Sequence, residues 1–264
     1  MPIMVSGVRV MINLTFVIVM AARDRDLPGL FGDRRPSLWW RGLFGTFSLI
    51  LSFASIAAIG VGESSFLQSS SSIFVGLLAP RVLKVANPSG VWLALGAGLL
   101  GVALLSHPRL DDVHPLGRLY GLGAGGLAAL AYLMIARAGR SNSPRTVIFY
   151  FSLVGLVVHA AAFLFLRPSG PASMEVWSYV ILAGFCATVG QHFLTRAYQE
   201  APAAWNAIAS YSGPVMSLMI AALWFGRWPD GWGVVGAALI VGSGITSAVI
   251  HRNRTAEKAK AKSP

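Results

Sequence analysis

Charged residues are scarce in this sequence of 264 residues. They make up 12% of the chain, about half of the roughly 25% typical of a soluble domain, whereas hydrophobic residues make up 55%. Only ten residues are acidic, and no long apolar segment contains a pair of them. This composition excludes an ordinary soluble protein.

Chemically reactive groups are equally sparse. The single cysteine, Cys186, lies within an apolar segment, which excludes a disulfide within the chain and a thiolate metal site, and we expect it to be a small buried hydrophobe. No apolar segment places a nucleophile beside a base or carries several histidines. The loop His107–His114 holds two His and two Asp, but Pro108 within it and Pro115 directly after it favour a solvated connector over a metal site. We therefore predict no enzyme, no cofactor and no metal.

What the sequence has instead is long apolar runs. A bilayer-spanning helix needs about 20 apolar residues. Nine segments approach this length: 3–22, 42–62, 64–80, 85–106, 119–136, 146–166, 176–195, 201–226 and 231–250. The runs are continuous and rich in Ala, Leu and Gly, without the alternation of membrane strands. The fold class predicted is an all-α integral membrane protein with nine transmembrane helices. Residues 1–22 could also be a signal peptide. That alternative is weaker, because segment 146–166 is an apolar counterpart of these residues at the distance of the internal repeat described below.

The basic residues predict the orientation. If Pro264 lies in the cytoplasm, fifteen Lys and Arg face the cytoplasm and four face outside, and this asymmetry follows the positive-inside rule. The inner group is Arg23, Arg25, Arg34, Arg35, Arg41, Arg81, Lys84, Arg137, Arg140, Arg145 and five residues of 252–262. We expect a multi-pass protein of the bacterial inner membrane with Met1 outside. The net charge of +11 then needs no nucleic-acid partner.

The chain also repeats itself. Gln68–Leu104 returns in altered form as Ser210–Thr246, with Ser70 matching Ser212 and Trp92 matching Trp232. The two copies fall five crossings apart, so they run in opposite directions through the bilayer, as in the inverted repeats of many transporters. A five-helix unit would begin before Met1, so the predicted plan is an inverted five-plus-five helix repeat that lacks its first helix.

Several motifs resemble those of a known family. Residues 196–204 (RAYQEAPAA), 210–214 (SYSGP), 225–226 (FG) and 236–240 (GAALI) are similar to the second half of an EamA-type permease of the drug/metabolite transporter superfamily, and 62–68 (GESSFLQ) and 78–80 (LAP) resemble its first half. The resemblance implies ten helices in two inverted halves around a central cavity. This sequence departs from the family pattern in two places. It lacks a counterpart of the family's first helix, and it has Ser72 where the family frequently has Pro. The domains expected are 1–106 (first repeat), 107–118 (external connector), 119–250 (second repeat) and 251–264 (a basic, disordered cytoplasmic tail).

Polar residues at a spacing of four suggest a binding site. Gln68 and Ser72 share one helical face with Ser64, and their repeat partners Ser210 and Pro214 share one with Asn206. Such residues either line a cavity or hydrogen-bond neighbouring helices, and both readings stay open.

Further candidates lie on other segments. His192 and Arg196 follow Thr188 at the same spacing; Arg196 either pairs with a substrate anion or extends to the headgroups, and His192 either carries a proton or packs. Tyr132 and Tyr211 offer aromatic walls, and the resemblance places both helices beside the cavity. Arg9 is the one charge inside an expected span, and it should face a cavity, a partner or the outer headgroups.

The function predicted is a permease that moves a small polar or amphipathic metabolite, such as an amino acid, a nucleotide-related metabolite or a drug, by alternating access. The family resemblance carries most of this prediction. The alternative is a membrane-integral protein without transport activity, either truncated or a helper subunit. The expected partners are a small-molecule substrate and the lipid bilayer, and a homodimer remains open.

Overall fold

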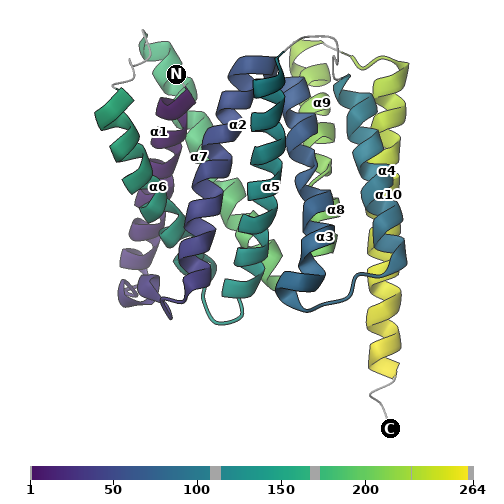
Figure 1. The fold of residues 1–264 in the computed structure, drawn as a ribbon, viewed down its shortest axis with the longest axis horizontal. Coiled ribbons are helices and arrows are strands. Elements are labelled where there is room, and N and C mark those ends of the chain that lie inside the picture. Colours follow the sequence, from purple (N-terminus) through teal and green to yellow (C-terminus); the bar gives the residue numbers. More distant parts are fainter. Residues whose placement is uncertain (1, 108–113, 167–172, 227, 261–264) are drawn as a thin grey trace.

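The computed structural model describes residues 2–107, 114–166, 173–226 and 228–260, and this part of the chain is helical without strands (Figure 1). The long helices are α1 (Pro2–Arg23), α2 (Pro36–Ser69), α3 (Ser71–Leu83), α4 (Ser89–Ser106), α5 (Pro115–Ala138), α6 (Pro144–Leu166), α7 (Met174–Glu200), α9 (Ser212–Phe225) and α10 (Gly231–Lys260). Two short elements, η1 (Pro28–Phe31) and α8 (Ala203–Ala209), complete the order. The all-α prediction is confirmed.

The helix ends follow local chemistry. Pro36 and Pro115 lie in the first turns of α2 and α5. Proline has no N–H, but the N–H groups of a first turn have no partner within the helix, so no hydrogen bond is lost. Ser173 caps α7 by accepting a hydrogen bond from the Val176 N–H at 3.4 Å. Lys84 and Gly226 end α3 and α9 in the left-handed conformation that commonly closes a helix.

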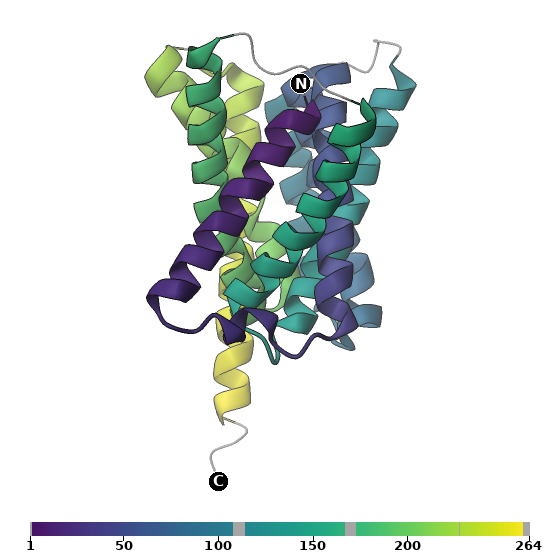
Figure 2. The same cartoon turned by 90° about the vertical axis from the view of Figure 1, so that its left-hand side faces the viewer.

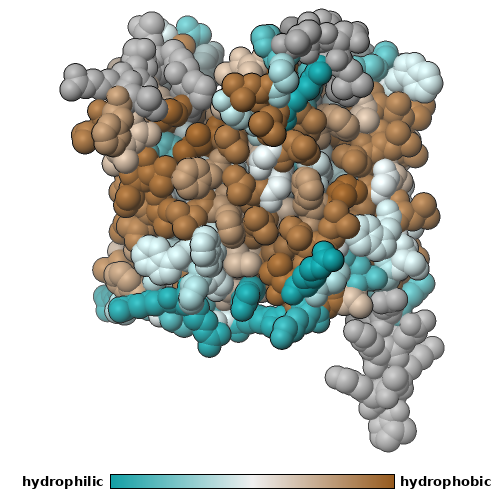
Figure 3. All heavy atoms as spheres, in the orientation of Figure 1, coloured by the Kyte–Doolittle hydropathy of each residue, from teal (hydrophilic) through white to brown (hydrophobic). Residues whose placement is uncertain are grey.

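Apolar residues form a belt around the molecule, with hydrophilic residues along its lower rim (Figure 3). Seven helical stretches among the described residues are long and apolar enough to cross a bilayer: Ile3–Arg23, Pro36–Leu83, Ser89–Ser106, Pro115–Ala138, Pro144–Phe165, Ala203–Phe225 and Gly231–Asn253. The second of them spans 48 residues and contains two of the nine expected segments. The expected segment 176–195 is helical, in α7, but is not one of the seven. An integral membrane protein is thus confirmed.

The 48-residue stretch is divided by Gly60. Its φ of 80° and ψ of 171° interrupt α2, and a positive φ of this kind is readily adopted only by glycine. A Cβ built at Gly60 would meet nothing within 4 Å, so the backbone conformation and not crowding selects this residue. The chain thereby passes from the first part of α2 to residues 61–83, and α5 lies between α2 and α3 (Figure 1).

The helices form two groups on either side of α5. Helices α1, α6 and α7 pack together with the first part of α2, while α3 packs on α8 and α4 packs on α10 (Figure 1). Helix α1 is inclined across the first group and contacts both α6 and α7 (Figure 2). The two ends of the chain lie at opposite ends of the bundle (Figure 1).

Two helices extend into segments that were expected to be connector or tail. Helix α5 begins at Pro115, inside the predicted connector 107–118, of which residues 108–113 lie outside the described residues. Helix α10 continues through His251 to Lys260, which corrects the predicted disordered tail over 251–260; residues 261–264 lie outside the described part. The Ala, Glu and Lys residues of 256–260 are good helix formers, so the helix extends past the apolar segment.

Candidate functional site

A cavity with a volume of about 570 Å³ is lined by residues of α2, α3, α4, α5 and α9. Five of the predicted site residues line it: Gln68, Ser72, Tyr132, Ser210 and Tyr211. Its wall is rich in hydroxyl groups and also carries apolar side chains such as Leu105, Pro214 and Leu218. Residues near the end of α4 and just after Gly60 line it as well, so this cavity, hereafter the central cavity, runs from that end of the bundle into its interior.

Both helical segments that carry the repeat are broken at this cavity. Ser70 separates α2 from α3, and Ser210 and Tyr211 separate α8 from α9. At each break a backbone hydrogen bond joins residues three apart in sequence instead of four, as in a 3-10 helix. The Ser70 N–H donates to the Leu67 carbonyl at 3.2 Å, and the Tyr211 N–H donates to the Ile208 carbonyl at 3.1 Å. Interrupted helices beside a cavity are a feature of transporter binding sites.

Gln68 and Ser72 differ in how their side chains are used. The Gln68 amide donates to the Ser64 hydroxyl at 2.8 Å, and its carbonyl accepts a bond from Ser52. Ser72 is buried, and its hydroxyl donates to the Ala207 carbonyl at 2.7 Å, which joins α3 to α8. The hydrogen bond of Ser72 agrees with the packing reading, and its binding role stays a prediction. Gln68 is a polar residue of the cavity wall whose side chain is held in place by two hydrogen bonds.

The two predicted tyrosines form the aromatic side of the central cavity. Tyr132 stacks on Tyr198 with ring centroids 4.9 Å apart and planes inclined by 22°. Tyr211 is 1% exposed, and its ring covers Gly98, where a Cβ would overlap the ring. Glycine on α4 is thus required for Tyr211 to stand at the cavity.

A smaller cavity of about 160 Å³ adjoins the central one, because Gln68, Ser71 and Tyr132 line both. Arg9 of α1 and Arg41 of α2 line this basic cavity, together with Gln191 of α7. The structure thereby places Arg9 at a cavity, one of its expected surroundings.

Arg41 corrects the prediction from the sequence, which counted it among the basic residues of the inner membrane face. It is 3% exposed, and its guanidinium lies over the Phe151 ring at 4.5 Å from the centroid. Arg41, Gly45, Ser48 and Ser52 all line the basic cavity and recur at intervals of four, three and four. That spacing marks one helical face and was the signal that could have found them.

His192 and Arg196 belong to a different place. They line a pocket of about 400 Å³ at the lower end of the bundle, with the α1–α2 and α5–α6 connections. The Arg196 Nε lies 2.6 Å from a Glu200 carboxylate oxygen, and both side chains are more than half exposed. The structure does not bring these two residues to the central cavity.

Asn206 also stands apart. Its side-chain amide donates to the Ala197 carbonyl at 2.7 Å and to the Ala201 carbonyl at 3.3 Å, and so it ties α8 to the end of α7. It lines a separate pocket with Trp205 and Ser247. The hydrogen bonds give Asn206 a packing role. Cys186, expected to be buried, is exposed on α7, a surface that a bilayer would cover.

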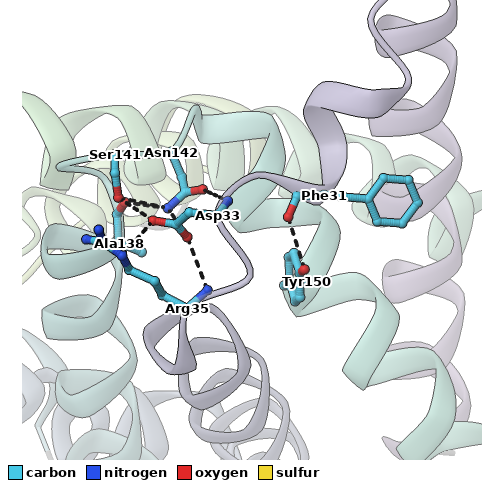
Figure 4. A network of polar contacts seen from close by, with 7 residues as sticks. All are labelled: Phe31, Asp33, Arg35, Ala138, Ser141, Asn142 and Tyr150. Atoms are coloured by element: carbon cyan, nitrogen blue, oxygen red, sulfur yellow. Dashed lines mark hydrogen bonds and ion pairs between the residues drawn. The ribbon is translucent and has the colours of Figure 1, made fainter.

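Loops at the lower end are held by a polar network (Figure 4). The Ser141 hydroxyl donates to one Asp33 oxygen at 2.6 Å and the Asn142 amide donates to the other at 2.9 Å. These hydrogen bonds, the Ser141 one above all, lower the pKa of the Asp33 carboxyl. The Tyr150 hydroxyl adds a bond to the Phe31 carbonyl at 3.1 Å. The network joins the connection between α1 and α2 to the one between α5 and α6.

No group of three or more His, Cys, Asp or Glu that could hold a metal ion occurs within the described ranges. The loop His107–His114, considered above for a metal site, lies largely outside them, since residues 108–113 are not described.

Comparison with known proteins identifies the family. The model of the EamA-like transporter family matches residues 115–247, just over half of the 264 residues. The chain belongs to the EamA-like transporter family. It is an EamA-type permease, as its motifs suggested, and the family and its named relatives are transporters rather than enzymes.

The relatives of this EamA-type permease are distant in sequence, but the matches cover more than half of this chain. The pseudopaline exporter CntI of Pseudomonas aeruginosa is 28% identical over 206 residues, which cover 78% of this chain and 72% of the exporter. Solute carrier family 35 member G1 of Mus musculus is 25% identical over 267 residues, 94% of this chain and 71% of the carrier. A riboflavin transporter of Vibrio cholerae is 28% identical over 152 residues, 57% of this chain and 50% of that protein.

A solved crystal structure shares the fold of the permease. It superposes with a TM-score of 0.81 at 18% sequence identity and covers 96% of this chain and 88% of its own. At this identity the likeness concerns the fold alone.

Proposed function

We propose that this EamA-type permease moves a small polar or amphipathic metabolite across the bacterial inner membrane by alternating exposure of the central cavity. The observation that carries the proposal is the position of that cavity between two broken helical segments, 61–83 and 203–225. Its hydroxyl-rich and partly apolar wall suits a ligand with both polar and apolar parts. Relatives named for the export of pseudopaline and the transport of riboflavin support a small-molecule substrate.

The proposed topology has nine crossings, two inverted halves and Met1 outside. It requires the stretch Pro36–Leu83 to cross twice, reversing near Gly60, and α7 to cross despite its polar residues. The inverted sequence repeat and the opposite positions of the two chain ends support it (Figure 1). Reporter fusions at both ends should report opposite sides, and two cytoplasmic reports would overturn the odd number of crossings.

Cysteine accessibility tests the cavity. In a Cys186→Ala background, Ser69→Cys and Ser217→Cys place thiols on the cavity wall, whereas Ile220→Cys on α9 is a matched control that is 57% exposed on the apolar surface. In intact membranes a charged maleimide should label the first two and leave Ile220→Cys unlabelled, because the bilayer excludes it. Equal labelling at the three positions would contradict an aqueous cavity.

Uptake by proteoliposomes tests transport. Labelled glutamate, riboflavin and uridine monophosphate represent an amino acid, a vitamin and a nucleotide. We expect at least one of them to enter faster than into protein-free liposomes. If none does and the cavity cysteines stay unlabelled, the proposal is wrong.

A further inference from the structure

The basic cavity holds two positive charges that have no acidic partner. Its lining consists of Arg9, Arg41, neutral polar residues and apolar side chains, without a carboxylate. The Nε atoms of Arg9 and Arg41 are buried and have no hydrogen-bond partner in the described chain, and none of the ion pairs that the described residues form includes either arginine. Buried charges are costly unless paired, so two such groups at one cavity indicate a function.

The packing around Arg41 directs its guanidinium into this cavity. Gly45 follows one helical turn later, and a Cβ at Gly45 would overlap Nη1 of Arg41, so the absent side chain leaves room for the guanidinium. The Phe151 ring covers the group. With an exposure of 3%, Arg41 cannot extend to lipid headgroups, which leaves the cavity as its surroundings.

The neutral polar groups of the cavity do not neutralise the arginines. The Ser48 hydroxyl donates to the Ala124 carbonyl at 2.8 Å, the Ser52 hydroxyl donates to Gln68, and the Gln191 amide donates to Thr195 at 3.2 Å. These bonds hold the walls in place. Arg9 and Arg41 also lie close enough to repel each other electrostatically, so a shared anion between them would remove an unfavourable interaction.

We propose that Arg9 and Arg41 bind the oxyanion group of an organic anion whose body occupies the central cavity. The inference rests on the proposed function and names its substrate class. Guanidinium groups recognise carboxylate and phosphate with paired, charge-assisted hydrogen bonds. A volume of about 160 Å³ accommodates such a headgroup but little more, while the adjoining 570 Å³ can hold an amphipathic body reached past Gln68 and Tyr132.

Thermal unfolding of the full chain in lipid nanodiscs tests the inference. Sodium phosphate and sodium succinate are compared with sodium chloride at equal ionic strength, in wild type, Arg9→Gln and Arg41→Gln. Arg196→Gln is the matched control, because that side chain is more than half exposed and lies outside the basic cavity. We expect the oxyanions to raise Tm by about 3 °C or more in wild type and Arg196→Gln, and this increment to disappear in the two cavity variants.

The general salt effect of these anions is common to all variants and cancels in the comparison. A larger increment in phosphate than in succinate identifies a phosphoryl headgroup, and the reverse identifies a carboxylate. Arg41→Lys, which keeps the charge without the planar fork, should retain part of the increment and serves if Arg41→Gln does not fold. Equal increments in wild type, Arg9→Gln and the Arg41 variants would overturn the inference.

The result is independent of transport. If the increments are lost in the cavity variants while no labelled compound enters proteoliposomes, the anion site stands and the permease proposal fails. If transport occurs but the increments are equal in all variants, the permease proposal stands and the anion site fails.

Discussion

The two adjoining cavities differ in chemistry although they share Gln68, Ser71 and Tyr132. The central cavity has hydroxyl and apolar walls and no charge, whereas the basic cavity is one quarter to one third of its volume, about 160 against 570 Å³, and carries two guanidinium groups. Recognition of charge and accommodation of an organic body are thus separated in space. A substrate that satisfies both must extend across the junction.

The cavities also differ in origin. The broken segments 61–83 and 203–225, which carry the repeat, supply most of the central cavity, while α1, α6 and α7 contribute only to the basic one. The two broken segments therefore account for the shape of the central cavity, whereas the charge of the basic cavity comes from α1 and the first part of α2.

The largest expected effect comes from filling the basic cavity without removing a charge. Gly45→Leu should displace the Arg41 guanidinium, because a Cβ there overlaps its Nη1, and so lower the transport rate per folded protein by about ten-fold or more. The overpacking should also lower the free energy of unfolding by about 1–3 kcal/mol. Gly96→Leu is the control, because a Cβ there meets nothing within 4 Å. Initial uptake rates and Tm measure both. Similar losses in the two variants would show that the loss does not come from displacing Arg41 in the basic cavity.

A smaller effect is expected at the junction. Tyr132→Phe keeps the stack on Tyr198 but removes the hydroxyl of a residue that lines both cavities. Losing one hydrogen bond of about 0.5–1.5 kcal/mol should lower the transport rate about two- to ten-fold with little change in Tm. Tyr198→Phe, on a ring that lines neither cavity, should leave the rate unchanged. An unaffected rate in Tyr132→Phe would show that substrate does not cross the junction.

Ser72 separates packing from binding within the central cavity. Ser72→Ala removes the bond to the Ala207 carbonyl between α3 and α8, so it should lower the free energy of unfolding by about 1 kcal/mol. Transport per folded protein should stay the same. Ser69→Ala is the comparison, because that hydroxyl bonds to Ser65 within its own helical segment and should cost less stability. A selective loss of transport in Ser72→Ala would show that Ser72 binds the substrate.

The smallest effect lies outside both cavities and depends on pH. Hydrogen bonds from Ser141 and Asn142 lower the pKa of Asp33 in the folded state. The stabilisation is therefore complete above the unfolded pKa of about 3.9 and is lost as the pH falls through the lower folded pKa. From pH 5 to pH 3 the free energy of unfolding of wild type should fall further than that of Asp33→Asn, by less than about 1 kcal/mol because the site is exposed to solvent. Parallel curves would show that the network adds nothing.

Much of the fold could be read from local patterns. Long apolar runs such as 146–166 became helices because an apolar bilayer requires every backbone group to bond within its own segment. The helical boundaries were less predictable. Gly60 divides a continuous apolar stretch, and the breaks at Ser70 and Ser210 fall inside expected spans, because each depends on local backbone angles that hydropathy does not encode.

The sequence by itself determined an all-α membrane protein of the EamA type and brought forward five residues that line one cavity, since periodicity and motifs are local properties of the chain. It could not determine that the Arg41 side chain is buried inside the bundle and not at the membrane surface. Nor could it determine that Asn206 and His192 lie away from the central cavity. A helical face is known from spacing, but what it faces depends on which helices pack together. Arg9 and Arg41 reach one cavity only because α1 packs against α2, and contacts between separate helices are decided by tertiary packing.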